Sequence, residues 1–208
     1  MKILILDCDG VLYPFSQMNF SDVFYSLKKI DKKLNLPQNY LETLQEIEKT
    51  KGTYAVFYQL WVMLNFNEAK IEILNAQIVE DTDYSNITPN LKLFKIIKKL
   101  QKKYSVIVLT DNTVLHLDKI FQKLWNKNLK ASGIKHYAIE DAKDGDFFHV
   151  KQDDGLSFFC KKQNIRPENC LLIEDNQANV LAAQKIGMNS IFINEKTDIC
   201  KLLEELSF

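Results

Sequence analysis

Four short apolar runs, spread along the chain, set the pattern of the sequence. They cover residues 3–6, 106–109, 171–173 and 191–193. None of them alternates polar with apolar positions, so each predicts a strand that is buried on both faces. Strands of this kind are typical of parallel sheets whose two faces are covered by helices.

Helical periodicity separates the later runs. Two apolar stripes at helical spacing lie before the second run and after the third: Leu93, Ile96, Ile97 and Leu100, then Ala178, Leu181 and Ala182. The earlier helix is expected to begin at Thr88-Pro89-Asn90, with Pro89 in its first turn, and Gly187 is expected to close the later one. Strands that alternate with helices predict a doubly wound α/β fold, with a mostly parallel, Rossmann-like sheet.

The long stretch between the first and second runs has a different pattern of apolar and polar residues. Helical periodicity without a convincing strand covers residues 19–34, 38–50, 53–64 and 67–81. Consecutive helices inserted into an α/β chain predict a separate helical subdomain that forms a cap over the site. We therefore expect a core of residues 1–14 and 86–208, with residues 15–85 as the inserted cap.

Composition indicates no special partner. The chain has 208 residues and a formal net charge of zero, from 27 basic and 27 acidic side chains, which indicates neither a nucleic acid polymer nor an anionic membrane as a partner. The first apolar run is too short for a signal peptide, and no stretch approaches the ~20 apolar residues of a membrane span. The four cysteines form no CxxC pair, so free thiols are expected. We expect a cytoplasmic monomer or weak homodimer.

Acidic and polar side chains follow three of the predicted strands. They are Asp7 and Asp9 after the first, Thr110, Asp111 and Asn112 after the second, and Glu174 and Asp175 after the third. Ligands of doubly wound sheets bind at the carboxyl ends of the strands, so these side chains are expected around one crevice, except Asp111, which is expected to point elsewhere. So many carboxylates repel one another unless a cation lies among them, and all-oxygen ligands suit Mg²⁺.

Four motifs resemble, in order, those of the haloacid dehalogenase superfamily of phosphatases. They are Asp7-Cys8-Asp9-Gly10-Val11 with its preceding strand, Val108-Leu109-Thr110-Asp111-Asn112, Lys151 in the segment 150–159, and Leu172-Ile173-Glu174-Asp175-Asn176. The helical insertion lies where this superfamily carries its class I cap. The Leu12-Tyr13-Pro14 extension is similar to the pyrimidine 5'-nucleotidase-like branch, and the chain also resembles phosphoglycolate phosphatase-like members.

The resemblance implies a division of labour among these residues. Asp7 attacks phosphorus to form an aspartyl-phosphate, and Asp9 first protonates the leaving oxygen and then takes a proton from water. Thr110 hydrogen-bonds a phosphoryl oxygen, and Lys151 neutralises the transferring group. The Mg²⁺ ligands implied are Asp7, the backbone carbonyl of Asp9, and Asp175. Glu174 is implied either to bind the ion through water or to hold the surrounding groups of the site. Further contacts to a small phosphomonoester are expected from Asp111, Asn112, Tyr13 and Phe15.

The sequence departs from the superfamily pattern at three places. Gln152 replaces the proline that often follows the lysine, which leaves Lys143 as a rival for that role. The fourth motif is Glu-Asp where Asp-Asp is more common, so either acid is a candidate for direct metal contact. Cys8 between the two aspartates is interpreted as a small apolar side chain that faces the core.

Other classes of protein fit the motifs less well. A true dehalogenase needs no acid at Asp9, because halide leaves unprotonated. A phospho-receiver domain carries its acid pair after the first strand and its phosphoaccepting aspartate after the third, and it lacks the helical insertion. A phosphomutase uses the same four motifs and differs through its cap, and a non-catalytic binding protein on this fold is the third alternative.

Substrate choice is expected to lie with the cap and the loop after Asp9. Tyr54, Phe57, Tyr58 and Trp61 have helical spacing, which serves either cap packing or stacking of a nucleobase. Tyr13 and Phe15 are better candidates for substrate contact, because the first motif fixes their position. His116, His136 and His149 have no metal-ligand spacing and are interpreted as surface or structural residues.

Overall fold

The computed structural model describes residues 2–14, 23–51, 53–142, 151 and 154–206. Within it the chain forms two compact units. One consists of Met1–Gln17 with Tyr84–Phe208, and the other is Met18–Asp83. The second unit is thus inserted into the first between its first and second strands.

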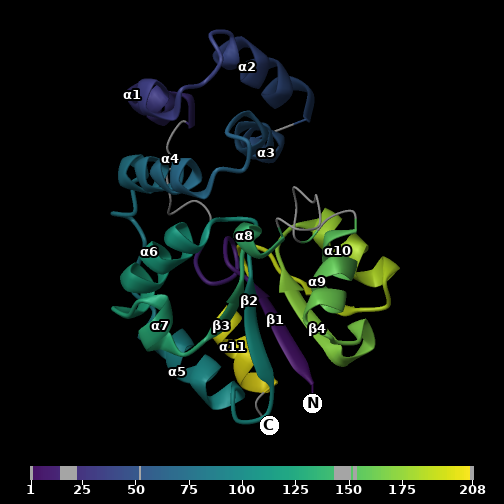
Figure 1. Ribbon diagram of the computed structural model, residues 1–208. Helices are drawn as coiled ribbons and strands as arrows, with labels where there is room; N and C mark the ends of the chain where they lie inside the picture. The colour runs from purple at the N-terminus through teal and green to yellow at the C-terminus, as the bar shows by residue number, and fades with distance from the viewer. Residues whose placement is uncertain (1, 15–22, 52, 143–150, 152–153, 207–208) are drawn as a thin grey trace. The chain divides into compact units, whose positions relative to one another are not determined.

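The larger unit is built on a five-stranded sheet in the order β3-β2-β1-β4-β5, with every neighbouring pair parallel. The strands are β1 (Ile3–Asp7), β2 (Ser105–Leu109), β3 (Lys135–Tyr137), β4 (Cys170–Glu174) and β5 (Asn189–Phe192). Figure 1 shows β1 in the middle of this sheet, with β2 and β4 beside it. The predicted α/β fold with a parallel sheet is confirmed.

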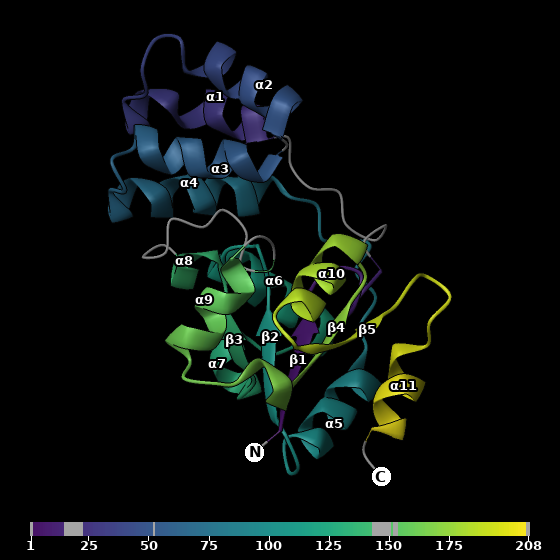
Figure 2. The ribbon, with the colours of Figure 1, turned by 90° about the vertical axis from the view of Figure 1, so that its right-hand side faces the viewer.

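Helices cover both faces of the sheet, as a doubly wound fold requires. They are α5 (Leu91–Leu100), α6 (Val114–Trp125), α7 (Leu129–Ser132), α8 (Ile139–Ala142), α9 (Gly155–Lys162), α10 (Gln177–Lys185) and α11 (Ile199–Glu205), with a 3-10 turn at Pro167–Asn169. Figures 1 and 2 show α9 and α10 on one face, and α5, α6 and α11 on the other. None of the helices in the described ranges is long and apolar enough to cross a membrane.

The core lies between the sheet and these helices. All five residues of β1 are buried, since both its faces and both its edges are covered. On one face, a buried cluster joins the sheet to α9 and α10 and includes Ile5, Leu109, Phe159, Leu172 and Ala183. This burial stabilises the three central strands, whose carboxyl ends carry the motifs.

The two edge strands differ from the prediction. β3 was not predicted, because Lys135-His136-Tyr137 is only three residues long and contains no apolar run. The last predicted strand lies one or two residues earlier in the chain and is not buried on both faces, since it forms the edge next to β4. Phe192 in it is 45% exposed.

Two helix details also differ. Pro89 lies before α5, whose N-cap is Asn90, with its side chain accepting a hydrogen bond from the Leu93 backbone N–H. The stripe predicted for the later helix is only partly confirmed. Ala182 packs against the core, but Leu181 is 56% exposed, and the residues that α10 buries are Asn179, Val180 and Ala183. Tertiary context selects which of two weakly apolar faces turns inward, and periodicity alone does not distinguish them.

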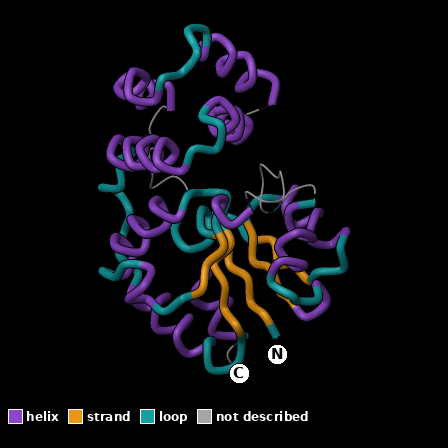
Figure 3. Tube along the Cα trace, in the orientation of Figure 1, coloured by secondary structure: helices purple, strands orange, loops and turns teal. Residues whose placement is uncertain are grey.

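The inserted unit is helical, as predicted. It contains α1 (Val23–Leu34), α2 (Tyr40–Lys51), α3 (Thr53–Met63) and α4 (Glu68–Asp81), drawn in purple in Figure 3. A core of its own includes Leu27, Leu44, Leu60 and Leu74, one from each helix. Asp81 at the end of α4 accepts hydrogen bonds from Ser26 and Lys29 of α1, which joins the first and last helices of the unit.

The core assignment predicts a contrast between two leucines of adjacent elements. We expect Leu172→Ala in β4 to lower the free energy of unfolding by about 2–5 kcal/mol, because a buried leucine leaves a cavity. The exposed Leu181→Ala in α10 is expected to change it by no more than about 0.5 kcal/mol. Urea unfolding of both variants measures the difference, and equal losses would contradict the burial assigned to α10.

Candidate active site

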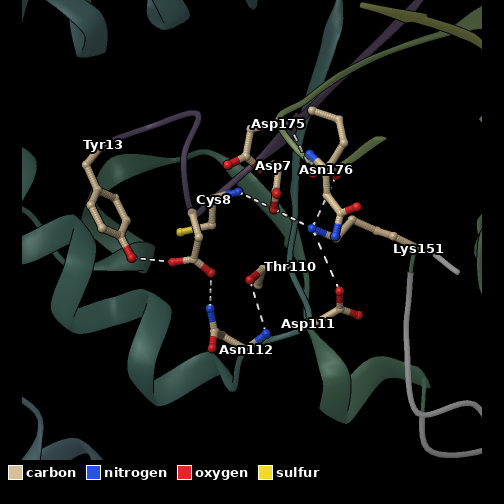
Figure 4. Close-up of polar contacts among 11 residues, drawn as sticks. Asp7, Cys8, Tyr13, Thr110, Asp111, Asn112, Lys151, Asp175 and Asn176 are labelled. Atoms are coloured by element: carbon tan, nitrogen blue, oxygen red, sulfur yellow. Dashed lines mark hydrogen bonds and ion pairs between the residues drawn. The ribbon is translucent and has the colours of Figure 1, made fainter. Parts of the chain in front are cut away.

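The carboxyl ends of the three central strands bring the motif side chains together. Asp7 is the last residue of β1, Thr110 directly follows β2, and Glu174 is the last residue of β4. Parallel pairing sets Asp7 opposite Leu109 and Leu6 opposite Ile173, so the three ends are level. All three side chains are buried, and Figure 4 shows Asp7 and Thr110 at the centre of the group.

Lys151 lies among the carboxylates. Its Nζ is 2.6 Å from Asp7 Oδ1, 3.3 Å from Glu174 Oε2 and 3.8 Å from Asp111 Oδ2. The expectation that Asp111 points elsewhere is wrong, because its carboxylate is buried and faces the lysine (Figure 4). The rival lysine, Lys143, lies outside the described residues.

One lysine does not balance this many buried carboxyls. Burial raises the pKa of Asp7, Lys151 opposes that shift, and Glu174 reinforces it, so that the pKa stands well above its ordinary value. Burial alone would lower the pKa of Lys151, but the carboxylates of Asp7, Glu174 and Asp111 outweigh it, and the pKa is raised. The lysine is therefore charged, and the remaining negative charge favours a further cation.

Three of the carboxyls could hold such a cation. One oxygen each of Asp7, Glu174 and Asp175 lies within 4.8 Å of the other two. Glu174 Oε1 accepts hydrogen bonds from the backbone N–H groups of Asp175 (3.2 Å) and Asn176 (3.0 Å), and its Oε2 forms the ion pair with Lys151. Burial, followed by the charge of Glu174, raises the pKa of Asp175 to about 6. A set of oxygen donors with excess negative charge fits Mg²⁺.

The loop after β1 turns sharply and carries Asp9. Gly10 has a φ of +73°, and the backbone N–H of Leu12 donates to the carbonyl of Cys8 over 2.9 Å. Cys8 is buried, as expected of an apolar filler, and its backbone N–H donates to Asp7 Oδ1 at 2.6 Å. The turn therefore holds the two aspartates in fixed positions on either side of Cys8.

Neutral donors hold the Asp9 carboxylate. The Tyr13 hydroxyl donates to Asp9 Oδ1, and Asn112 Nδ2 donates to Asp9 Oδ2. Burial raises the pKa of Asp9, while Tyr13, Lys151 and Asn112 lower it in part. The sequence analysis missed these partners, although the spacing of four residues between Asp9 and Tyr13 across a glycine turn is a signal that could have found one of them.

The remaining predicted contacts are only partly described. Asn112 donates through its backbone N–H to Thr110 Oγ1 at 3.1 Å, so both lie in the site. Phe15 lies outside the described residues. Tyr13 lies beside the site but is only 3% exposed, with its hydroxyl on Asp9.

The other candidates from the sequence are the histidines and the aromatic residues of α3. His116 is buried in α6, its Nδ1 lies 2.7 Å from the Tyr84 hydroxyl, and burial lowers its pKa to about 4. His149 lies outside the described residues. Among the aromatic residues of α3, Trp61 is 5% exposed and Phe57 packs against the core of the inserted unit, which agrees with packing for these two. The side chain of Tyr54 is not among those described.

Comparisons with known proteins identify the family. The sequence profile of haloacid dehalogenase-like hydrolases matches residues 1–187. The chain belongs to the haloacid dehalogenase-like hydrolase family. No curated protein sequence matches it.

Solved structures of the haloacid dehalogenase (HAD) family share this fold. An enzyme of the family from Bacteroides thetaiotaomicron matches with a TM-score of 0.55 at 19% identity, with 97% of this chain and 98% of that chain covered. The same enzyme has been crystallised with magnesium and inorganic phosphate. A HAD-like hydrolase from Porphyromonas gingivalis matches with a TM-score of 0.56 at 16% identity, covering 99% and 97%. CbbY from Rhodobacter sphaeroides, in complex with xylulose-1,5-bisphosphate, matches with a TM-score of 0.55 at 12% identity, covering 93% and 86%.

The contact between Gly10 and Asp175 makes a prediction about cation binding. A Cβ at Gly10 would lie 1.8 Å from Asp175 Oδ2, so Gly10→Ala has to displace that carboxylate. We expect the variant to bind Mg²⁺ more weakly in calorimetric titration. Gly187→Ala is the matched control, because its φ of +79° carries the same backbone strain, about 1–2 kcal/mol, with no atom within 4 Å of the added carbon.

The two variants separate strain from collision. Both are expected to lose stability in thermal unfolding, but only Gly10→Ala is expected to lose affinity for Mg²⁺. Unchanged affinity in Gly10→Ala would remove Asp175 from the set of cation ligands.

Proposed function

We propose that this chain is a magnesium-dependent phosphatase that hydrolyses a small phosphomonoester through an aspartyl-phosphate intermediate. The observation that carries the proposal is the pairing of two aspartates with different surroundings on one loop. Asp7 lies 2.6 Å from the Lys151 ammonium group, whereas Asp9 is bonded to the neutral Tyr13 and Asn112 side chains. The ammonium group favours the ionised, nucleophilic form of Asp7 against the burial that raises its pKa, whereas the neutral partners of Asp9 are compatible with proton exchange.

In the first step, a carboxylate oxygen of Asp7 forms a bond to phosphorus while the bond from phosphorus to the ester oxygen breaks. Lys151 lies 2.6 Å from Asp7 Oδ1, where its charge stabilises the negative charge that spreads over the transferring group. The Thr110 hydroxyl, buried at the end of β2, would donate to a phosphoryl oxygen. Asp111 and Asn112 would act indirectly, because Asp111 faces the Lys151 ammonium group and the Asn112 amide donates to Asp9.

Asp9 would move one proton in each half of the reaction. It gives a proton to the departing ester oxygen, which leaves as a neutral alcohol, and becomes a carboxylate. It then takes a proton from the water that attacks the aspartyl-phosphate, which releases inorganic phosphate and restores both aspartates.

The residues that would hold Mg²⁺ are Asp7, Asp175 and the backbone carbonyl of Asp9, with Glu174 as a further candidate. The set fits because it offers only oxygen donors and gathers three carboxyl groups around a single lysine, Lys151. When bound, the ion supplies positive charge to the nucleophile and to the phosphoryl oxygens. The magnesium and phosphate bound to the Bacteroides enzyme of the same fold support this assignment.

A matched pair of variants tests the nucleophile. We expect Asp7→Asn to reduce magnesium-dependent hydrolysis of 4-nitrophenyl phosphate to the background rate, because an amide oxygen is a poor nucleophile. Glu204→Gln is the control, because it removes a carboxylate on α11 that pairs with Lys92 and not with the site. EDTA is expected to abolish wild-type turnover and added Mg²⁺ to restore it. Robust turnover by Asp7→Asn, with deamidation excluded by mass spectrometry, would contradict the assignment of Asp7 as the nucleophile.

For substrate class, we propose a preference for nucleoside monophosphates, which rests on the Leu12-Tyr13-Pro14 sequence. A panel of nucleoside monophosphates, sugar phosphates and phosphoglycolate, scored by kcat/KM from released phosphate, is expected to favour the nucleotides. A clear preference for the other substrates would refute this choice and leave the phosphatase proposal intact. Conversion of a sugar phosphate to its isomer without phosphate release would instead identify a phosphomutase.

A further inference from the structure

Both oxygens of the Asp9 carboxylate accept a hydrogen bond from a neutral side chain. Oδ1 accepts from the Tyr13 hydroxyl and Oδ2 from Asn112 Nδ2, as the dashed lines at Tyr13 and Asn112 in Figure 4 mark. We propose that Tyr13, together with Asn112, is a positioning residue that fixes the Asp9 side chain for proton transfer, and that Tyr13 is not a substrate contact. This inference rests on the function proposed above, in which Asp9 moves the proton.

The local fold directs Tyr13 at Asp9. Gly10, at a φ of +73°, reverses the chain after the aspartates, and a backbone bridge joins Asp9 to Tyr13. The Tyr13 side chain is 3% exposed, so bulk water does not compete for its hydroxyl. The turn itself directs the Tyr13 hydroxyl at Asp9, so this contact belongs to the first motif.

Asn112 holds the same carboxylate from a different element. It follows β2, and its backbone N–H donates to Thr110 Oγ1 at 3.1 Å, so its own position is set by the end of that strand. Asp9 is therefore fixed between the loop after β1 and the loop after β2. A side chain held at both oxygens from two elements loses the free rotation about its own bonds that would otherwise misdirect the proton.

The geometry leaves Asp9 able to react. A carboxylate has about four lone-pair sites, and two donors occupy only two of them. The remaining sites are open to the proton that Asp9 transfers, and to the hydrogen bond with the ester oxygen or the water that exchanges it. Both donors also stabilise the carboxylate that remains after the proton has left. Their effect should accordingly be largest where the leaving group requires a proton.

Leaving-group dependence separates positioning from other roles of Tyr13. An alkyl phosphate releases an alkoxide that needs the proton of Asp9, whereas 4-nitrophenyl phosphate releases a phenolate that is stable without it. The ratio kcat/KM reports the steps up to departure of the leaving group. We expect Tyr13→Phe to lower kcat/KM for an alkyl phosphate roughly tenfold, a part of the 10²–10⁴ that general acid catalysis supplies, with less than about twofold change for 4-nitrophenyl phosphate.

The matched control is Tyr104→Phe. Tyr104 precedes β2 at the opposite end of the sheet from the site, and its hydroxyl donates to the Leu206 carbonyl at 3.2 Å. The variant also removes one hydrogen bond of a tyrosine hydroxyl, but kcat/KM for both substrates should remain unchanged. Asn112→Ala is the second variant, and it is expected to show the same selective loss as Tyr13→Phe.

A double-mutant cycle tests whether Tyr13 acts through Asp9. Asp9→Asn is expected to depress alkyl phosphate hydrolysis selectively, and adding Tyr13→Phe to it should then cost nothing further on that substrate. An equal loss on both substrates, a change in KM alone, or full additivity in the cycle would overturn the inference and leave the proposed function standing. A loss of kcat/KM selective for the alkyl phosphate in Asp9→Asn, without such a loss in Tyr13→Phe, would also overturn the inference and leave the proposed function standing. Absence of leaving-group selectivity in Asp9→Asn itself would overturn both.

Discussion

The site depends on the burial of several carboxyl groups around a single ammonium group. Lys151 contacts Asp7, Glu174 and Asp111 within 4 Å, and all four side chains are almost fully buried. A buried charge without a partner is destabilising by several kcal/mol, so loss of this lysine would leave three carboxylates to repel one another. Burial raises the pKa of Asp7 and Glu174 adds to the shift, and the lysine only partly offsets them. Electrostatics therefore calls for a cation at the side of the cluster where Asp175 lies.

The parallel sheet is what gathers these charges. In a parallel arrangement the carboxyl ends of neighbouring strands lie at one edge, and the three central strands β1, β2 and β4 each end in a motif. Their interiors are fully apolar, which keeps register and burial strict. The edge strands β3 and β5 carry no residue of the site. The fold thus keeps its most exposed strands away from the part whose geometry matters for chemistry.

The sequence predicted this central part well and its surroundings less well. Buried strands with motifs at their ends carry a strong local signal, and the helical insertion has a periodicity of its own. β3 was not predicted, because a short edge strand such as Lys135-His136-Tyr137 needs no apolar run. The inward face of α10 was predicted poorly, because it depends on the neighbours that cover it. The inward turn of Asp111 and the Tyr13 contact depend on tertiary geometry, which residue type alone does not reveal.

The partners of the two aspartates explain how neighbouring identical residues take different tasks. Lys151 has only donors, so it favours the ionised form of Asp7 and cannot accept a proton from it in exchange. The Tyr13 hydroxyl is both donor and acceptor, and the Asn112 amide carries one group of each kind. Asp9 can therefore remain hydrogen-bonded to Tyr13 whether it is a carboxylate or a carboxylic acid, whereas Asp7 loses its ion pair when protonated. The distinction between nucleophile and acid thus arises from the chemistry of the neighbours that each carboxylate contacts, and not from the aspartates themselves.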